Sequence, residues 1–160
     1  MTGQIYINDK DAWETWGVFM VGESLDNLLL PPPMKSYTEN NFRSQHGKQI
    51  FFGNPRKESR DIDIEFCISA ENRAAYLLAY KSFTNELSSS VVSLRLPELN
   101  IELSLILSSF LSLGYYDKFG KLTVRFNDPL SEPTIYFDEV ALVSDDDVFI
   151  ISETGKKITF

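Results

Sequence analysis

The sequence predicts a β-rich α+β fold, an antiparallel β-sandwich or open barrel with a single packed helix over about residues 69–87. Three observations predict it. Several segments alternate apolar and polar residues, which is the period of a strand with one face in water. One segment between them repeats apolar residues every three or four positions, which is the period of a helix. The length of 160 residues, 43% of them hydrophobic, suits one domain with a sizeable core.

The first clear strand and the helix follow one another directly. In "DIDIEFCI", residues 61–68, isoleucines and Phe66 alternate with acidic residues. From Ser69 the spacing becomes helical. The expected core-facing stripe is Tyr76, Tyr80, Phe83 and Leu87, flanked by Ala70, Ala74 and Leu77. Ser69 is the predicted N-cap, because its hydroxyl can accept a hydrogen bond from an amide of the first turn. The three serines at 88–90 are expected to end the helix.

Three more strands are predicted after the helix. "VVSLRLPEL" at 91–99 alternates as far as Pro97, which marks a strand end or edge because proline cannot donate to a ladder. "NIELSLILSSFLSLG" at 100–114 alternates and then loses its register near Ser108 and Ser109, which predicts a β-bulge. "KLTVRF" at 121–126 repeats the pattern, and the residues before it predict a hairpin between these last two strands.

A projecting arm is predicted over about residues 31–55. Three prolines open it and favour an extended path. Two strand-like pieces, "KSYTENNF" and "KQIFF", then flank a turn-like Gln-His-Gly. Extended arms usually gain order by adding to a neighbour's sheet, so the apolar residues of this arm are candidate intersubunit contacts. These residues are Met34, Tyr37, Phe42, Ile50, Phe51 and Phe52.

We expect residues 1–129 to form one domain and residues 130–160 to form a C-terminal β-extension that is not an independent domain. The extension holds three short strand-like pieces and an acidic turn at 145–147. Its 31 residues are too few for a core of their own, so it is expected to pack on the main domain or on a partner.

Charge and composition exclude several classes of protein. Twenty-three acidic residues against fifteen basic ones give a formal charge of −8, which disfavours tight binding to a phosphate backbone. No apolar run approaches the roughly 20 residues that cross a bilayer, and the first residues do not have the pattern of a secretion signal. Synthesis in the cytoplasm fits, since the single cysteine, Cys67, cannot form an intramolecular disulfide.

No set of residues predicts catalysis. His46 is the only histidine, and no close spacing of metal-ligating residues is present. Cys67 lies inside a strand pattern, where an unreactive thiol is expected, so a nucleophile pair with His46 is not favoured. The aspartates at 145–147 lack the EF-hand spacing, and the glycines form no phosphate-binding loop. We therefore expect no enzymatic activity, no cofactor and no metal.

Four aromatic residues are candidates for an interface or a ligand surface: Trp13, Trp16, Tyr115 and Tyr116. Two tryptophans three residues apart can anchor an interface, although core packing is the simpler interpretation. Because β-sandwiches commonly host sugars on aromatic platforms, a carbohydrate-binding or adhesion module is the alternative function.

The order of the elements resembles the N-terminal, tail-tube-like domain of siphophage distal tail proteins. The resemblance rests on "RDIDIEF", on the helix "ISAENRAAYLLAYKSFTNELSS", on "VVSLRLPELNIELSLIL" and on "KLTVRFNDP", and it covers roughly residues 3–129. The stretch "INDKDAWETWGVFMVGESLDNLLLPPPMK" is similar to short tail proteins in phages or prophages of Bacteroides-like bacteria.

The resemblance implies a structural virion protein, located in the tail. It implies a hexameric ring of identical subunits between the tail tube and the receptor-binding apparatus, in contact with other tail proteins, with DNA passing through its lumen unbound. Longer members continue into a carbohydrate-binding-like domain. Only 31 residues follow Pro129 here, so sugar binding does not carry over.

Overall fold

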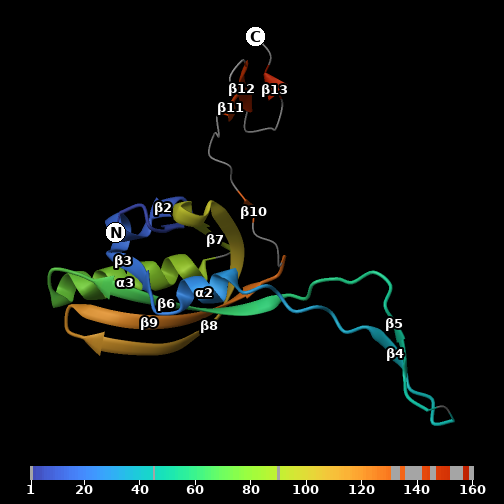
Figure 1. The fold of residues 1–160 in the computed structure, drawn as a ribbon. Coiled ribbons are helices and arrows are strands. Elements are labelled where there is room, and N and C mark those ends of the chain that lie inside the picture. Colours follow the sequence, from blue (N-terminus) through green and yellow to red (C-terminus); the bar gives the residue numbers. More distant parts are fainter. Residues whose placement is uncertain are drawn as a thin grey trace.

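The computed structural model describes residues 2–44, 46–89 and 91–130, and the backbone of short strands between 134 and 158. Its main sheet has the strand order β2-β1-β7-β8-β9-β6-β3, and every pairing in it is antiparallel. The sheet curves into a half-barrel around one main helix, α3 (Figure 1). The predicted fold class, a β-rich α+β domain with one packed helix, is confirmed.

Strands β6 (Arg60–Ser69) and β9 (Phe119–Asp128) are neighbours in the sheet and pair along their whole lengths. Their apolar residues alternate into the core as the sequence predicts. The buried set is Ile62, Ile64, Phe66 and Ile68 of β6 with Leu122, Val124 and Phe126 of β9. Phe83 of α3 packs edge-on against Phe66, with ring centroids 5.2 Å apart, so the helix covers the concave face of the sheet.

Helix α3 (Arg73–Ser88) begins four residues later than predicted, and the assignment of Ser69 as its N-cap is wrong. Ser69 is still in the ladder, because it pairs with Phe119 and its amide donates to the Gly17 carbonyl at 2.9 Å. Asn72 is the cap, and its side chain accepts from the Ala75 amide at 2.9 Å. The backbone therefore completes its strand pairing before a three-residue link starts the helix.

The buried stripe of α3 contains Tyr76, Phe83 and Leu87, with Tyr80 partly buried, as predicted. Ala74 and Leu77 are exposed, so the prediction that they flank the core is wrong. The helix ends at Ser88 as expected.

Two short helices were not predicted. α1 (Ala12–Trp16) is capped by Asp11, whose carboxylate accepts from the amides of Trp13 and Glu14. Gly17 ends it with φ 66°, and a Cβ there would lie 2.2 Å from the Ser69 carbonyl oxygen. α2 (Ser24–Leu29) lies on β6, since the Ser24 hydroxyl accepts from the Glu65 amide at 2.9 Å.

The remaining strands of the sheet are short except for β8 (Ile101–Tyr116). They are β1 (Tyr6–Ile7), β2 (Lys10–Asp11), β3 (Val18–Val21) and β7 (Val91–Leu96). β7 ends at Leu96 and Pro97 opens a 3-10 turn (Pro97–Leu99), so the predicted strand end at Pro97 is confirmed. The predicted bulge in β8 is confirmed, because the register with β9 shifts between Leu107 and Ser109 and again between Phe110 and Ser112.

Residues 31–59 leave the sheet as an extended hairpin (Figure 1). Near its base, Lys35 donates its amide to the Arg56 carbonyl at 2.8 Å, and further out β4 (Thr38–Asn40) pairs with β5 (Gln49–Phe51). We call residues 31–59 the arm.

After residue 130 the structure describes only strand backbone. β10 (Thr134–Ile135) pairs with Ile101 and Glu102 of β8. β11 (Leu142–Ser144), β12 (Asp147–Ile151) and β13 (Lys157–Ile158) form an antiparallel meander. Asp145 and Asp146 of the expected acidic turn lie outside the described residues.

Candidate assembly surfaces

The arm presents apolar side chains to solvent. Phe51 and Phe52 are 76% and 72% exposed, and Met34, Tyr37 and Phe42 are also exposed. Ile50 is partly buried, and the Tyr37 and Phe52 rings meet with centroids 5.5 Å apart. All six candidate intersubunit residues thus lie on one projecting ribbon, away from the core.

The arm also differs in charge from the rest of the chain. It contains five basic residues and two acidic ones, a formal charge of +3. The other residues therefore carry a formal charge of −11, and the two parts add up to the −8 of the whole chain. Opposite charges on two parts of one chain favour contact between copies, because the arm of one copy is attracted to the body of another.

A second surface follows the free edge of β8. β7 pairs with β8 only from Ile101 to Ile106, whereas β9 pairs with its other side from Ile106 to Tyr116. Among the described strands, none pairs with the β7-side edge of β8 from Leu107 to Tyr116. Such a row of backbone donors and acceptors is a template for another strand.

Apolar side chains line this edge. Phe110 and Leu113 lie opposite Val124 and Leu122 of β9, so they point toward the core side of the sheet, as does Tyr115 opposite Gly120. They nevertheless remain 43%, 45% and 42% exposed, because the core does not extend over this half of the strand. We call residues 107–116 the β8 edge.

The convex face of β6 and β9 is polar. Arg125 makes two hydrogen bonds of 2.7 Å to the Asp63 carboxylate, and Lys121 pairs with Glu65 at 2.7 Å. The Arg125 hydrogen bonds lower the pKa of Asp63. A hollow of about 450 Å³ beside them holds the carboxylates of Glu23, Asp63 and Glu65. Because both cations are neutralised by these ion pairs, the face offers little attraction to a phosphate backbone.

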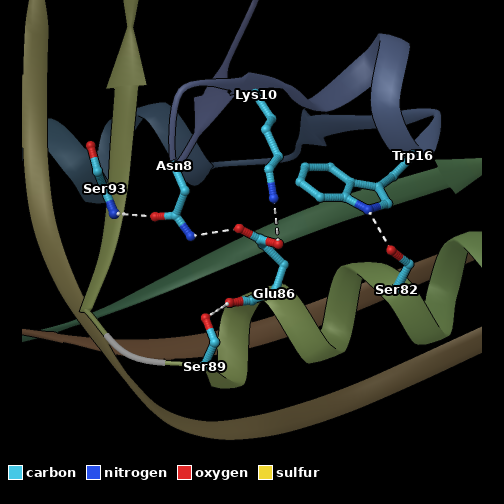
Figure 2. Close-up of polar contacts among 7 residues, drawn as sticks. All are labelled: Asn8, Lys10, Trp16, Ser82, Glu86, Ser89 and Ser93. Atoms are coloured by element: carbon cyan, nitrogen blue, oxygen red, sulfur yellow. Dashed lines mark hydrogen bonds and ion pairs between the residues drawn. The ribbon is translucent and has the colours of Figure 1, made fainter.

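A polar network fixes the N-terminal strands to the end of α3 (Figure 2). Glu86 accepts from the Asn8 amide nitrogen at 2.9 Å and from Lys10 Nζ at 2.8 Å, and these two contacts lower the pKa of Glu86. Asn8 also accepts from the Ser93 amide at 2.9 Å, so one side chain bridges α3 and β7. Trp16 donates to the Ser82 hydroxyl at 3.0 Å. These contacts attach the N-terminal residues to α3 and β7.

The four aromatic candidates do not form one surface. Trp16 is 4% exposed and packs against Phe83, and half-buried Trp13 packs edge-on against Phe19. Tyr115 contacts Tyr76, at 5.2 Å between ring centroids, and Tyr116 is 73% exposed. No aromatic contact among the described residues joins the tryptophans to the tyrosines.

The remaining chemical candidates are dispersed. His46 is exposed on the arm, far along the chain from Cys67 in β6. Burial raises the pKa of the Cys67 thiol, and the charge of Lys121 opposes this shift, so the environment does not favour the thiolate. Among the described residues, no three His, Cys, Asp or Glu side chains gather as a metal site would need. None of the described helices is long and apolar enough to cross a membrane.

Sequence reasoning missed the β8 edge, although a signal was present. The apolar run "LILSSFLSLGYY" continues ten residues beyond the point where the partner strand "VVSLRL" ends. A strand much longer than its neighbour must leave part of one edge unpaired, so the difference in length is informative.

Comparison with known proteins gives a likeness of fold. No protein-family model and no curated protein matches the chain. Among solved structures it is similar to the SPP1 Dit protein (gp 19.1), described as a paradigm of the hub adsorption apparatus in phages that infect Gram-positive bacteria. The TM-score is 0.59 at 8% sequence identity, covering 78% of this chain and 49% of that one. The chain thus has a phage distal-tail-like fold and spans about half the length of the Dit chain.

Proposed function

We propose that this protein is a structural component of a phage or prophage tail, a distal-tail ring subunit that joins the tail tube to the host-recognition apparatus. The observation that carries the proposal is the fold shared with SPP1 Dit over 78% of the chain. The proposed role is non-enzymatic, and the proposed place of the protein is the virion tail. Its proposed partners are further copies of itself in a hexameric ring and other tail proteins.

Two features of the described surface support self-assembly. The arm exposes aromatic residues that a lone monomer leaves in water, and the β8 edge leaves strand backbone unpaired. Monomeric proteins generally protect such edges because they promote association. An assembled ring gives both surfaces a partner.

The polar convex face supports passage of DNA through a lumen without binding. Its cations Arg125 and Lys121 are paired with carboxylates, and Asp61 accepts from Asn127 at 2.9 Å. In the proposed ring this face turns toward the lumen, where carboxylates repel phosphate and keep the channel non-adhesive.

The alternative, a carbohydrate-binding or adhesion module, receives less support. Trp16 is buried, and neither the hollow beside α2 nor a second one of about 430 Å³ on α3 has an aromatic residue in its lining. Sugar sites usually need such a platform in a concavity.

Light scattering across a concentration series, followed by electron microscopy of any large species, tests the proposal. We expect a discrete oligomer, with the mass of six chains, that images as a closed ring. A strict monomer at all concentrations contradicts self-assembly, and saturable quenching of tryptophan fluorescence by a glycan would then favour the alternative.

A variant lacking the arm sharpens the experiment. Replacing residues 34–57 with an Asn-Gly turn joins the chain where the two halves of the arm already pair, so the body is expected to fold. We expect this variant to have the circular dichroism of a folded protein and the mass of a monomer. If the variant instead keeps the same number of copies in its oligomer, the arm is not needed for assembly.

A further inference from the structure

We propose that the arm of one copy binds the β8 edge of the next copy, as strands added to the end of its sheet. This inference rests on the proposed function, because it identifies which surface of a ring subunit receives the arm. It goes beyond the shared fold, since that likeness says nothing of which segments meet.

The two surfaces match in chemistry. The β8 edge offers unpaired strand backbone together with half-exposed Phe110, Leu113 and Tyr115. The arm offers a two-stranded ribbon whose outer edges pair with no other described strand, and its Phe51 and Phe52 are largely exposed. Adding a strand satisfies the backbone of both partners. Because consecutive residues of a strand point to opposite faces, one of these two phenylalanines then covers the apolar strip.

The two surfaces also match in length. The segment "KQIFF" spans about 16 Å when extended, and the ten residues of the β8 edge span about 33 Å. The β8 edge is therefore long enough to receive the whole aromatic part of the arm. Neither surface needs to change its conformation first.

Geometry directs the arm to another copy. The arm rejoins the sheet where Arg60 pairs with Asp128, whereas the β8 edge runs toward the opposite end, where Ser69 pairs with Phe119. The β8 edge begins at Leu107, opposite Phe126, and its far end at Tyr116 lies about 30 Å along the strands from the point where the arm rejoins the sheet. The arm also extends away from the sheet (Figure 1), so its own β8 edge is not its partner.

Charge favours the same choice. The arm carries +3 and the rest of the chain −11, so the arm is attracted to the body of a second copy and the bodies repel each other. A contact between two different surfaces is heterologous. Repeated from copy to copy it closes into a ring or continues as a filament.

Cross-linking between differently labelled copies tests the proposal. In a Cys67→Ser background, one population carries Gln49→Cys on the arm and a second carries Ser109→Cys at the start of the β8 edge. A matched control carries Asn85→Cys on the outer face of α3. All three positions are exposed and polar, so the substitutions leave the apolar contacts in place.

After mixing and treatment with a short bis-maleimide, we expect covalent dimers from Gln49→Cys with Ser109→Cys. We expect none above background from Gln49→Cys with Asn85→Cys. Neither cysteine variant should cross-link by itself, because a heterologous contact joins unlike surfaces. Equal yields with the control, or dimers from single variants only, would overturn the proposal.

Light scattering of the same samples separates this inference from the proposed function. If the protein is an oligomer but Gln49→Cys forms no cross-linked dimer with Ser109→Cys, the proposed ring stands and the contact between the arm and the β8 edge is overturned. A monomer in every sample overturns both. As a second variant, Leu113→Lys is expected to lower the oligomer fraction at least tenfold at fixed concentration. The surface control Leu78→Lys is expected to leave the oligomer fraction unchanged. Equal effects of the two substitutions would also contradict the contact.

Discussion

Arg60 and Asp128 form an ion pair inside the protein, with Arg60 Nε 3.0 Å from Asp128 Oδ2 and side chains 9% and 2% exposed. The Arg60 guanidinium also donates to the carbonyl oxygens of Leu28 and Leu30. It therefore joins the end of α2, the return of the arm and the last residue of β9. Arg60 thus lies where the arm leaves and rejoins the body of the protein.

Arg60→Met is expected to lower the free energy of unfolding by about 3–5 kcal/mol, because it removes one partner of a buried ion pair together with the hydrogen bonds to Leu28 and Leu30. Urea unfolding measures the loss. Arg125→Met is the matched control, since the Arg125–Asp63 pair is partly exposed, with side chains 42% and 36% exposed, and exposed pairs contribute about 0.2–1 kcal/mol. Similar losses for the two variants would show that the buried pair contributes no more to the free energy of unfolding than the Arg125–Asp63 pair.

Asn72→Ala is expected to destabilise the protein by about 0.5–2 kcal/mol, because Asn72 caps α3 through the Ala75 amide. Ser69→Ala, at the position that the sequence suggested as the cap, should change stability by less than about 0.5 kcal/mol. Thermal or urea unfolding of both variants compares them directly. A larger loss from Ser69→Ala than from Asn72→Ala would favour Ser69 as the N-cap of the helix.

The central strands and α3 could be predicted because their residues follow a strict period. In β6 each isoleucine faces the core, and in α3 Tyr76, Phe83 and Leu87 do so. The start of α3 could not, since Ser69 and Asn72 are both good caps. The choice depends on the pairing of Ser69 with Phe119, fifty residues later.

The candidate surfaces divide in the same way. The arm could be predicted from its prolines and from the two strand-like pieces around the Gln-His-Gly turn, which are local features. The β8 edge depends on where β7 stops pairing, and the buried role of Arg60 depends on a partner 68 residues away. Helices α1 and α2, of five and six residues, are too short to show a helical period.

Gly120→Ala is expected to cost about 1–3 kcal/mol, because a Cβ at this position would lie 1.9 Å from the Tyr76 hydroxyl oxygen. Gly114→Ala, on the partner strand of the same hairpin, meets nothing closer than 3.4 Å and should be tolerated. Urea unfolding of the two variants checks the difference. Equal tolerance would mean that the Tyr76 ring moves aside at no cost.

Tyr76→Phe is expected to leave stability unchanged or to raise it by up to about 1 kcal/mol. The Tyr76 hydroxyl is buried and has no hydrogen-bond partner among the described residues, and the same burial raises the pKa of Tyr76. Loss of an unsatisfied hydroxyl removes a desolvation cost. In the Gly120→Ala background the substitution should recover part of the lost stability, whereas a further loss there would reveal a partner for the hydroxyl.

The ion pairs predict a specific loss of stability in acid. Contacts from Lys10 and Asn8 lower the pKa of Glu86 in the folded protein below its unfolded value near 4.3. The carboxylate therefore contributes stability at pH values above about 4.3, and this contribution is lost as the pH falls through the folded pKa. Glu86→Gln should cost about 1–2 kcal/mol at pH 7 and progressively less in acid, where the wild-type side chain is also neutral. Urea unfolding of both proteins from pH 7 down to the acid limit of folding measures this convergence.

In a Lys10→Met background the pH dependence of the difference should weaken, because one of the two contacts that depress the pKa is gone. A gap between wild type and Glu86→Gln that stays constant with pH would show that the substitution acts through packing and not through charge.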